Sequence, residues 1–384
     1  MKRLIIGLLL LLSLCAPAAA EERINLGTEG YDGLSYCFTL PDGRLVFSGT
    51  KGMKGNYQNS RGRLLCLNPD LSLSWDYVDP TEGSWGFGGA QLLKNGLIAA
   101  VRSNSPKQST VQKEICYFTQ EGQPTGTPVD IYQPDISSSG ATGSCLSLTI
   151  IPGDAQTYFH YFMDWEGNIL FRLHSELTIG GGYNLLPAED GLVLAGCEQG
   201  YPACAKIMKV DLHGQTLWET VLPTLLPDGN ARLEWARTAP DGGFVAWLTE
   251  FSHGEGQGKL QRAHAVVKFD RDGRVQWMNR DAFEPSMRCD ALIADKDRIV
   301  VGVEEGQEFT GGAPHRFIWL NESGQYLGET QLTFGKDEKS YGSQLIPTES
   351  GLWVLKDIRM IRDGKNVLKE MDSVDEVLFK LPAL

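Results

Sequence analysis

The chain has 384 residues, 42% of them hydrophobic, and its 48 acidic residues outnumber its 35 basic ones, giving a formal net charge of −13. A chain of this length and composition can bury a large core. The acidic balance argues against nucleic acid and anionic lipid as main partners, because both are bound through basic patches.

The first twenty residues predict a secretory signal peptide. Lys2 and Arg3 form a charged start, residues 4–14 form a short apolar stretch, and Ala18–Ala20 form a small-residue cleavage site. The alternative is a lipoprotein signal with lipidation at Cys15, which we disfavour because Leu14 stands where a small residue is preferred. We expect residues 21–384 to form one domain of a bacterial protein that is secreted or periplasmic.

A pattern of two turns recurs about every fifty residues through the rest of the chain. The first turn, acidic or Asn-Gly, precedes an apolar run, as in residues 40–49 (LPDGRLVFSG) and 239–248 (APDGGFVAWL). The second turn is of the type D-x-x-G, as in residues 268–277 (KFDRDGRVQW). Repeats built only from hairpins predict an all-β fold, a β-propeller, in which four-stranded blades surround a central axis.

The number of blades follows from the positions of the first turns. These fall at Gly43, Gly96, Gly153, Gly191, Gly242, Asp297 and Gly351. They predict a seven-bladed propeller. Six or eight blades stay open as alternatives, because residues 141–178 offer only one clear hairpin.

The two ends of the chain predict how the ring closes. The last repeat ends at residues 376–384 (EVLFKLPAL), which read as the third strand of a blade without a fourth. Residues 24–26 form a spare short strand near the N-terminus. We expect this strand to complete the last blade, since closure removes the open edges of the ring.

Aromatic residues and cysteines complete the structural predictions. Trp75, Trp218 and Trp277 begin the fourth strand in three repeats, where bulky rings can fill the gap between neighbouring blades. Cys197 and Cys204 flank residues 198–203 (EQGYPA), and in an exported protein this spacing predicts a disulfide across a hairpin. No C-x-x-C pair and no His–Cys group at zinc spacing occurs, so we expect no metal.

Ligands of propellers are expected at one mouth of the central channel, where the connections enter the first strand of each blade. We assign to this mouth Asp32, Trp85, Tyr183, Arg232, Glu234, Arg288, Asp290 and Tyr341. Aromatic rings mixed with a few charges suit a carbohydrate or a peptide. The alternative is that the arginines and carboxylates are satisfied polar pairs on buried inner strands.

The D-x-x-G-x-x-x-W pattern of residues 268–277, with the related run at 210–218 (VDLHGQTLW), resembles bacterial exported propellers of the pyrroloquinoline-quinone-like and WD40-like class. The resemblance extends over the mature chain and implies the propeller fold. Quinone dehydrogenases of this class hold their cofactor with a vicinal disulfide. This chain has no adjacent cysteines, so we expect no cofactor.

Two functional classes follow from these features. The first is a monomeric, non-catalytic propeller that binds a partner protein or a glycan, since no nucleophile–base pair or metal cluster stands out. The alternative is an enzyme, a glycosidase or a lyase, that uses carboxylates of the channel mouth, namely Asp32, Glu234 or Asp290. The two classes differ in whether these carboxylates converge in an open pocket or are tied up in ion pairs.

Overall fold

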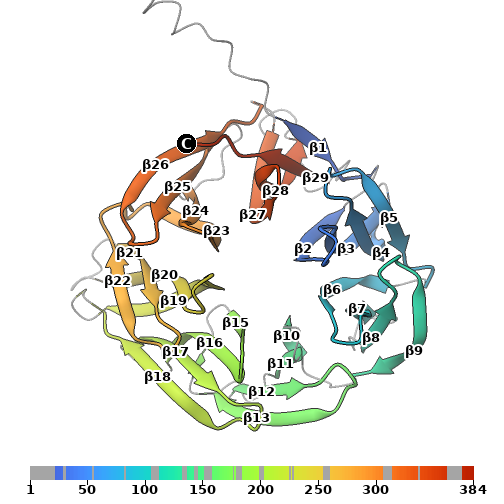
Figure 1. The fold of residues 1–384 in the computed structure, drawn as a ribbon, viewed down its shortest axis with the longest axis horizontal. Helices are drawn as coiled ribbons and strands as arrows, with labels where there is room; N and C mark the ends of the chain where they lie inside the picture. The colour runs from blue at the N-terminus through green and yellow to red at the C-terminus, as the bar shows by residue number, and fades with distance from the viewer. Residues whose placement is uncertain are drawn as a thin grey trace, which may run out of the picture.

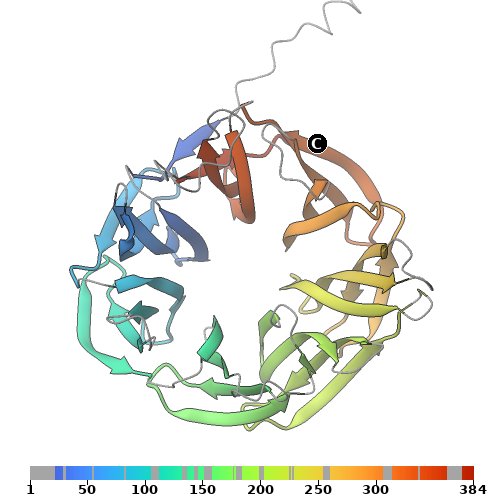
Figure 2. The same ribbon diagram turned by 180° about the vertical axis from the view of Figure 1, so that it is seen from behind.

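The computed structural model describes residues 22–28, 32–53, 56–81, 84–104, 112–131, 136–141, 146–150, 158–175, 177–178, 184–198, 203–224, 226, 229–253, 260–305, 314–335, 338–360 and 374–384. These residues form antiparallel sheets arranged side by side as blades of a ring (Figures 1 and 2). No helix in the described ranges is long and apolar enough to span a membrane.

Within each blade, the strands are stacked side by side in order from the axis of the ring to its rim (Figure 1). The innermost strands are β2 (Gly33–Thr39), β6 (Ser84–Leu92), β10 (Ile136–Ala141), β15 (Asn184–Ala188), β19 (Asn230–Thr238), β23 (Met287–Asp295) and β27 (Glu338–Thr348). The second strands are β3 (Leu45–Met53), β7 (Ile98–Asn104), β11 (Leu146–Ile150), β16 (Gly191–Glu198), β20 (Phe244–His253), β24 (Arg298–Glu305) and β28 (Gly351–Met360).

The third and outermost strands continue the same order. The third strands are β4 (Asn56–Leu67), β8 (Gln112–Phe118), β12 (Tyr158–Met163), β17 (Ala205–Val210), β21 (Leu260–Phe269), β25 (His315–Asn321) and β29 (Val374–Lys380). The outermost strands are β1 (Arg23–Asn25), β5 (Leu73–Val78), β9 (Pro124–Asp130), β13 (Ile169–Ser175), β18 (Thr216–Leu222), β22 (Val275–Asn279) and β26 (Tyr326–Leu332). The remaining strand is β14 (Leu177–Thr178).

The expected count of seven blades is wrong. Among the described residues, six sheets have the regular four-stranded form, whereas the sheet of β14 to β18 has five strands. In that sheet, β14 and β15 both pair with β16, so the innermost position is divided between two short strands. Residues 136–175 also differ from the expectation, because they form a complete sheet of β10 to β13 whose first connection is residues 142–145. Gly153 itself lies outside the described residues, and in the sequence it falls between β11 and β12.

The predicted closure of the ring by the N-terminal strand is confirmed. Strand β1 pairs with β29 in antiparallel register, with Ile24 opposite Leu378. The backbone pairing extends beyond the strand, since the Leu26 amide donates to the Glu376 carbonyl at 2.7 Å. The last blade thus takes three strands from the C-terminal end of the chain and one from the N-terminal end (Figure 1).

The D-x-x-G turns between third and outermost strands have a common geometry. In the turn after β21, the Asp270 side chain accepts the amides of Asp272 and Arg274, and Gly273 donates its amide to the Asp270 carbonyl. Gly273 has a φ of 78°, a conformation in which a side chain is strained. The Asp at the start and the Gly at the fourth position are therefore both required by the turn itself.

The outer tryptophans join neighbouring blades, as the sequence predicts. Trp277 on β22 packs against the turn glycine of the next blade, Gly324, where an added Cβ would lie 2.6 Å from the indole. Its Nε1 also donates to the carbonyl of Glu322 in the same turn at 2.8 Å. Trp75 makes the equivalent contact with Gly122. Glycine in each turn thus has a second use, because without a Cβ it leaves room for the ring.

The hydrophobic core lies between blades. Each cluster of buried apolar side chains combines residues of two adjacent sheets, as between β17 and β21 or between β25 and β28. The seam between the first and last blades has its own cluster, which includes Leu26, Leu34, Trp353 and Leu378. Each blade is therefore stabilised through its two neighbours.

Candidate functional site

The innermost strands carry β-bulges at corresponding places. The register of β19 with β20 shifts between Leu233 and Trp235, and that of β23 with β24 shifts between Cys289 and Ala291. Glu234 and Asp290 are thus the extra residues of two neighbouring bulges. A bulge turns the extra side chain away from the regular alternation of the strand and is common next to functional sites. In a regular strand these two side chains would simply follow the alternation between the faces of the sheet. The bulges give the Glu234 and Asp290 carboxylates different directions.

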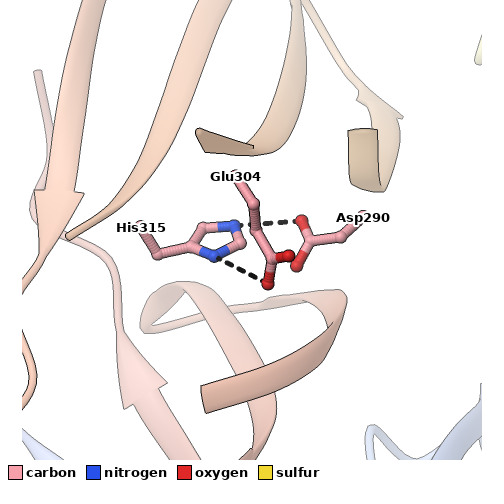
Figure 3. A group of neighbouring side chains, drawn as sticks. All are labelled: Asp290, Glu304 and His315. Atoms are coloured by element: carbon pink, nitrogen blue, oxygen red, sulfur yellow. Dashed lines mark ion pairs between the residues drawn. The ribbon is translucent and has the colours of Figure 1, made fainter. Parts of the chain in front are cut away.

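Asp290 lies in a network of polar side chains that bridges two blades. Figure 3 shows its three members from one blade, Asp290, Glu304 and His315. Its Oδ2 accepts a hydrogen bond from the Ser343 hydroxyl on β27 at 2.5 Å and lies 3.3 Å from Nζ of Lys356 on β28. Its Oδ1 lies 2.9 Å from Nε2 of His315 on β25, although not with the alignment of a hydrogen bond. Gly302 makes room for this carboxylate, since a Cβ there would lie 2.8 Å from Oδ1.

His315 is held between the ammonium of Lys356 and the carboxylate of Asp290. Lys356 is fully buried, and its Nζ lies 2.7 Å from Nδ1 of His315. An ammonium can only donate, so Nδ1 accepts and the ring proton lies on Nε2, facing Asp290. Burial and the neighbouring Lys356 charge lower the pKa of His315, although the Asp290 carboxylate opposes this shift. The imidazole is therefore neutral at physiological pH.

The two carboxyl groups of the network have opposite pKa shifts. Burial alone would raise the pKa of Asp290, but the neighbouring His315 ring, the Lys356 charge and the hydrogen bonds that Asp290 accepts hold it well below its usual range. Glu304 on β24 has a raised pKa, because of burial first and of the nearby Asp290 charge second. Glu304 lies opposite the exposed Arg288 in the β23–β24 ladder. The network thus contains two carboxyl groups whose surroundings separate their pKa values.

The network does not suit a metal ion. The candidate ligand atoms of Asp290, Glu304 and His315 lie within 4.8 Å of one another. However, Nζ of Lys356 lies 3.3 Å from Asp290, 2.7 Å from His315 and 3.9 Å from Glu304, so a cation is already in their midst. A divalent ion would need ligands at about 2.0–2.6 Å and would be strongly repelled by this buried ammonium. We therefore regard Lys356 as the built-in counterion of the network.

The other predicted carboxylates are also engaged by neighbouring groups. Glu234 forms an ion pair with Arg232 and accepts a hydrogen bond from the Thr249 hydroxyl at 2.7 Å. Asp32 is fully buried and accepts the backbone amides of Thr28 and Gly52. In the described ranges, no hydrogen bond or ion pair joins Asp32, Glu234 and Asp290 to one another. The Arg232–Glu234 pair agrees with the alternative of satisfied polar pairs on the inner strands, whereas Asp290 pairs with Lys356 of the next blade and Arg288 lies opposite Glu304.

The aromatic residues predicted for the channel mouth are only partly described. Trp85 lies on β6 and Tyr341 on β27, but their side chains fall outside the described part of the structure, and Tyr183 lies outside it altogether. The signal peptide and Cys15 lie outside it as well. The ligand-binding role of these residues stays a prediction.

Cys197 and Cys204 lie close together in the β16–β17 hairpin. Both side chains are half-buried, and Cys197 lies opposite Ala205, the residue next to Cys204. Successive residues of a strand face opposite sides of a sheet, so a bridge requires that Cys204, just before β17, departs from the alternation. The disulfide stays a prediction.

A groove of about 600 Å³ lies away from the predicted channel mouth, at the rim between two blades. Trp277 and Asn279 on β22 form one wall, and Tyr326 and Glu329 on β26 form the other. None of the residues predicted from the sequence as ligand-binding lines this groove.

Sequence reasoning found Asp290 but missed its partners. His315 is one of six histidines in the sequence, and its position does not single it out, because no two histidines have the close spacing of a metal pair. Ser343 lies in the last blade, 53 residues after Asp290, so no local pattern connects the two. The available signal was Lys356, a lysine that ends the apolar run LWVL (352–355) of a second strand. Charged residues within buried strands are rarely unpaired, so this lysine indicates a buried carboxylate nearby.

No family model and no curated protein matches this chain. Its structure is similar to the β-propeller domain of the Trilobed protease from Pyrococcus furiosus (11% identity, 88% of this chain and 99% of that chain, TM-score 0.50). It is also similar to Drosophila Plexin A in complex with Semaphorin 1b (8% identity, 95% of this chain and 88% of that chain, TM-score 0.51).

A third similar structure is prolyl oligopeptidase B from Galerina marginata (13% identity, 87% of this chain and 48% of that chain, TM-score 0.48). At these identities the likeness establishes the β-propeller fold and nothing more. The bacterial quinone-like or WD40-like class suggested by the repeats is not confirmed.

Proposed function

We propose that this protein is an exported, non-catalytic propeller that binds a partner protein or a glycan on a rigid face. The observation that supports the proposal is the engagement of the inner-strand carboxylates. Glu234 is paired with Arg232, Asp290 with Lys356, and Asp32 with two backbone amides. Carboxylates held in this way position blades and are not free to protonate a substrate or activate a water molecule.

The second candidate is a propeller enzyme that uses the Asp290 network. It is favoured by the opposite pKa shifts of Asp290 and Glu304, because paired groups with separated pKa values are typical of acid–base catalysis. Against it, His315 and Lys356 are almost completely buried, and Glu304 is only 22% exposed. The Asp290 side chain is only 13% exposed as well, so a substrate has little access to either carboxyl group.

The two candidates are separated by screening the mature protein on glycan arrays and in peptide pull-downs, and by assaying each ligand found for turnover. We expect binding without turnover. Trp85→Ala should abolish binding, whereas Glu234→Gln and Glu304→Gln should retain it, with folding of each variant checked by thermal unfolding. Turnover of a bound ligand that is abolished by Glu304→Gln would reject the binding proposal and support the enzyme.

A further inference from the structure

The rim groove is the groove of about 600 Å³ between β22 of one blade and β26 of the next. Its two walls are tied together, because Nδ2 of Asn279 on β22 donates to the carbonyl of Gly324, in the turn before β26, at 2.5 Å. Trp277 packs on the same glycine and donates its Nε1 hydrogen to the carbonyl of Glu322. The walls are therefore held in place without a ligand. The volume lies within the range of about 300–1,000 Å³ that is usual for small-ligand sites.

An exposed tyrosine distinguishes this joint between blades from the others. Tyr326 is the first residue of β26, is 53% exposed and lines the rim groove. Within the described ranges, its hydroxyl has no hydrogen-bond partner. The other outermost strands that follow a turn from a third strand begin with residues that are not aromatic, namely Leu73, Pro124, Ile169, Thr216 and Val275. The fold therefore does not require an aromatic ring at this position, and an exposed tyrosine beside a groove is a typical ligand contact.

The polar groups of the rim groove offer hydrogen-bond acceptors without a large net charge. Arg316 donates from Nε and from one Nη to Oε2 of Glu329, at 3.2 and 2.6 Å, so these two side chains neutralise each other. Oε1 of Glu329 accepts a long bond of 3.3 Å from Gln331 and keeps lone pairs for a ligand. Asp281, just after β22, is exposed and has no ion pair among the described residues. Acceptor oxygens thus line both walls of the groove.

We propose that the rim groove binds a neutral saccharide of one or two rings, with the Tyr326 ring against a sugar face and the carboxylates of Asp281 and Glu329 accepting sugar hydroxyls. A sugar ring has an apolar C–H face and hydroxyl groups along its edge, which match an aromatic ring beside acceptor oxygens. Trp277 on the opposite wall supplies a second apolar surface. Acidic saccharides are disfavoured, because the free carboxylate of Asp281 and the net charge of −13 repel them.

A peptide matches the same residues less well. A proline-rich segment would use the two aromatic side chains, but its backbone offers few donors for the acceptors on both walls. A basic peptide would pair with the carboxylates, but the charge of Glu329 is already matched by Arg316. A peptide strand added to the edge of β26 would be recognised through backbone groups and would not need Tyr326. The several hydroxyls of a sugar therefore suit this lining better.

The rim groove lies away from the channel mouth, so this site adds to the proposed function and stands or falls independently of it. Contacts from two walls leave much of a sugar in water, so we expect dissociation constants in the millimolar range. Array and pull-down screens retain tighter complexes and report the ligand of the channel mouth. The rim groove is therefore tested in solution, with free sugars at millimolar concentration.

The test records saturation-transfer NMR of the intact mature protein with maltose, cellobiose or N,N′-diacetylchitobiose in excess. We expect a saturable signal for at least one of these sugars, strongest on the C–H protons of one ring face. Tyr326→Ala should weaken binding by at least about tenfold, and Tyr326→Phe should retain it within a factor of about two, because the ring makes the contact. Absence of a signal with all three sugars would overturn the proposal, whatever the protein binds at the channel mouth.

Further variants place the sugar, with the folding of each checked by its Tm. Asp281→Asn removes a charged acceptor and should weaken binding by about fivefold. The matched control is Val275→Ala, at the equivalent position of the preceding outermost strand, which is 41% exposed, does not line the groove and should leave the signal unchanged. A signal that persists in Tyr326→Ala, or is lost in Trp85→Ala, would place the sugar elsewhere and overturn the proposal. Binding of a decaproline peptide through Tyr326, when none of the sugars binds, would assign the groove to peptides and overturn it as well.

Discussion

Substituting Leu26 tests whether the N-terminal segment stabilises the ring from its position in the last blade. Its side chain is 8% exposed and packs at the seam with Leu34 of the first blade and with Trp353 and Leu378 of the last. Leu26→Ala removes these contacts and leaves a cavity between the two blades. Buried Leu→Ala substitutions cost about 2–5 kcal/mol, and for a site near the end of a short strand we expect about 2.5 kcal/mol.

The control for this prediction is Leu73→Ala. Leu73 is 60% exposed on the outermost strand β5 of the first blade, so the same chemical change there should alter stability by less than about 0.5 kcal/mol. Both variants are compared with the wild-type protein by equilibrium unfolding in urea. Equal effects of the two substitutions would show that the seam cluster is not formed in solution.

Removing residues 22–28 makes the same test with a larger change. The deletion takes away β1 and leaves the outer edge of β29 without a partner. Unpaired edges favour association with other chains. We expect a lower Tm together with concentration-dependent aggregation, measured by calorimetry and light scattering. A truncated protein with the full Tm and a monomeric mass would contradict closure by β1.

Three further predictions concern turns, pH and the cysteines. Gly324 and Gly242 share a φ near 80°, but only Gly324 faces an indole, so Gly242→Ala should cost about 1–2 kcal/mol of unfolding free energy and Gly324→Ala clearly more. The pKa of His315 is lowered in the folded protein, so its stabilising contribution is complete above the usual value of 6.5 and is lost as pH falls below it. Urea unfolding between pH 7 and 5 should therefore show a steeper loss of stability in the wild-type protein than in His315→Gln; parallel curves would refute this. Peptide mapping of the exported protein without reduction should recover Cys197 linked to Cys204, and recovery of both as free thiols would refute the bridge.

The repeated turns could be predicted from the sequence because their signals are local. The D-x-x-G turns use a side chain and a backbone conformation within five residues, as Asp270 and Gly273 show. The closing strand was predictable for a different reason, since a third strand without a fourth at one end and a spare strand at the other leave few arrangements. Where these local signals were weak, at residues 136–188, Gly153 was assigned to the wrong connection and the divided innermost strand was missed.

The candidate site could be predicted only in part because its contacts are not local. Asp290 was selected correctly as a residue of an inner strand, but a bulge sets its direction, and a one-residue shift in register moves a side chain to the other face. Its partners Ser343 and Lys356 come from the next blade. The contact between the Glu376 carboxylate and the Leu34 amide was hidden for the same reason, since it forms only when the ring closes.

The central claim is that the carboxylates of the inner strands hold blades together and do not perform chemistry. Asp290→Asn tests it most directly, with Asp272→Asn in an exposed turn as the control, by measuring the free energy of unfolding in urea. Removing one partner of a buried pair leaves the Lys356 ammonium with only the more distant Glu304 carboxylate, so we expect Asp290→Asn to destabilise the protein by about 3 kcal/mol and Asp272→Asn to have little effect. Catalytic groups are commonly maintained against stability, so an Asp290→Asn protein as stable as the wild type, or more stable, would contradict the claim.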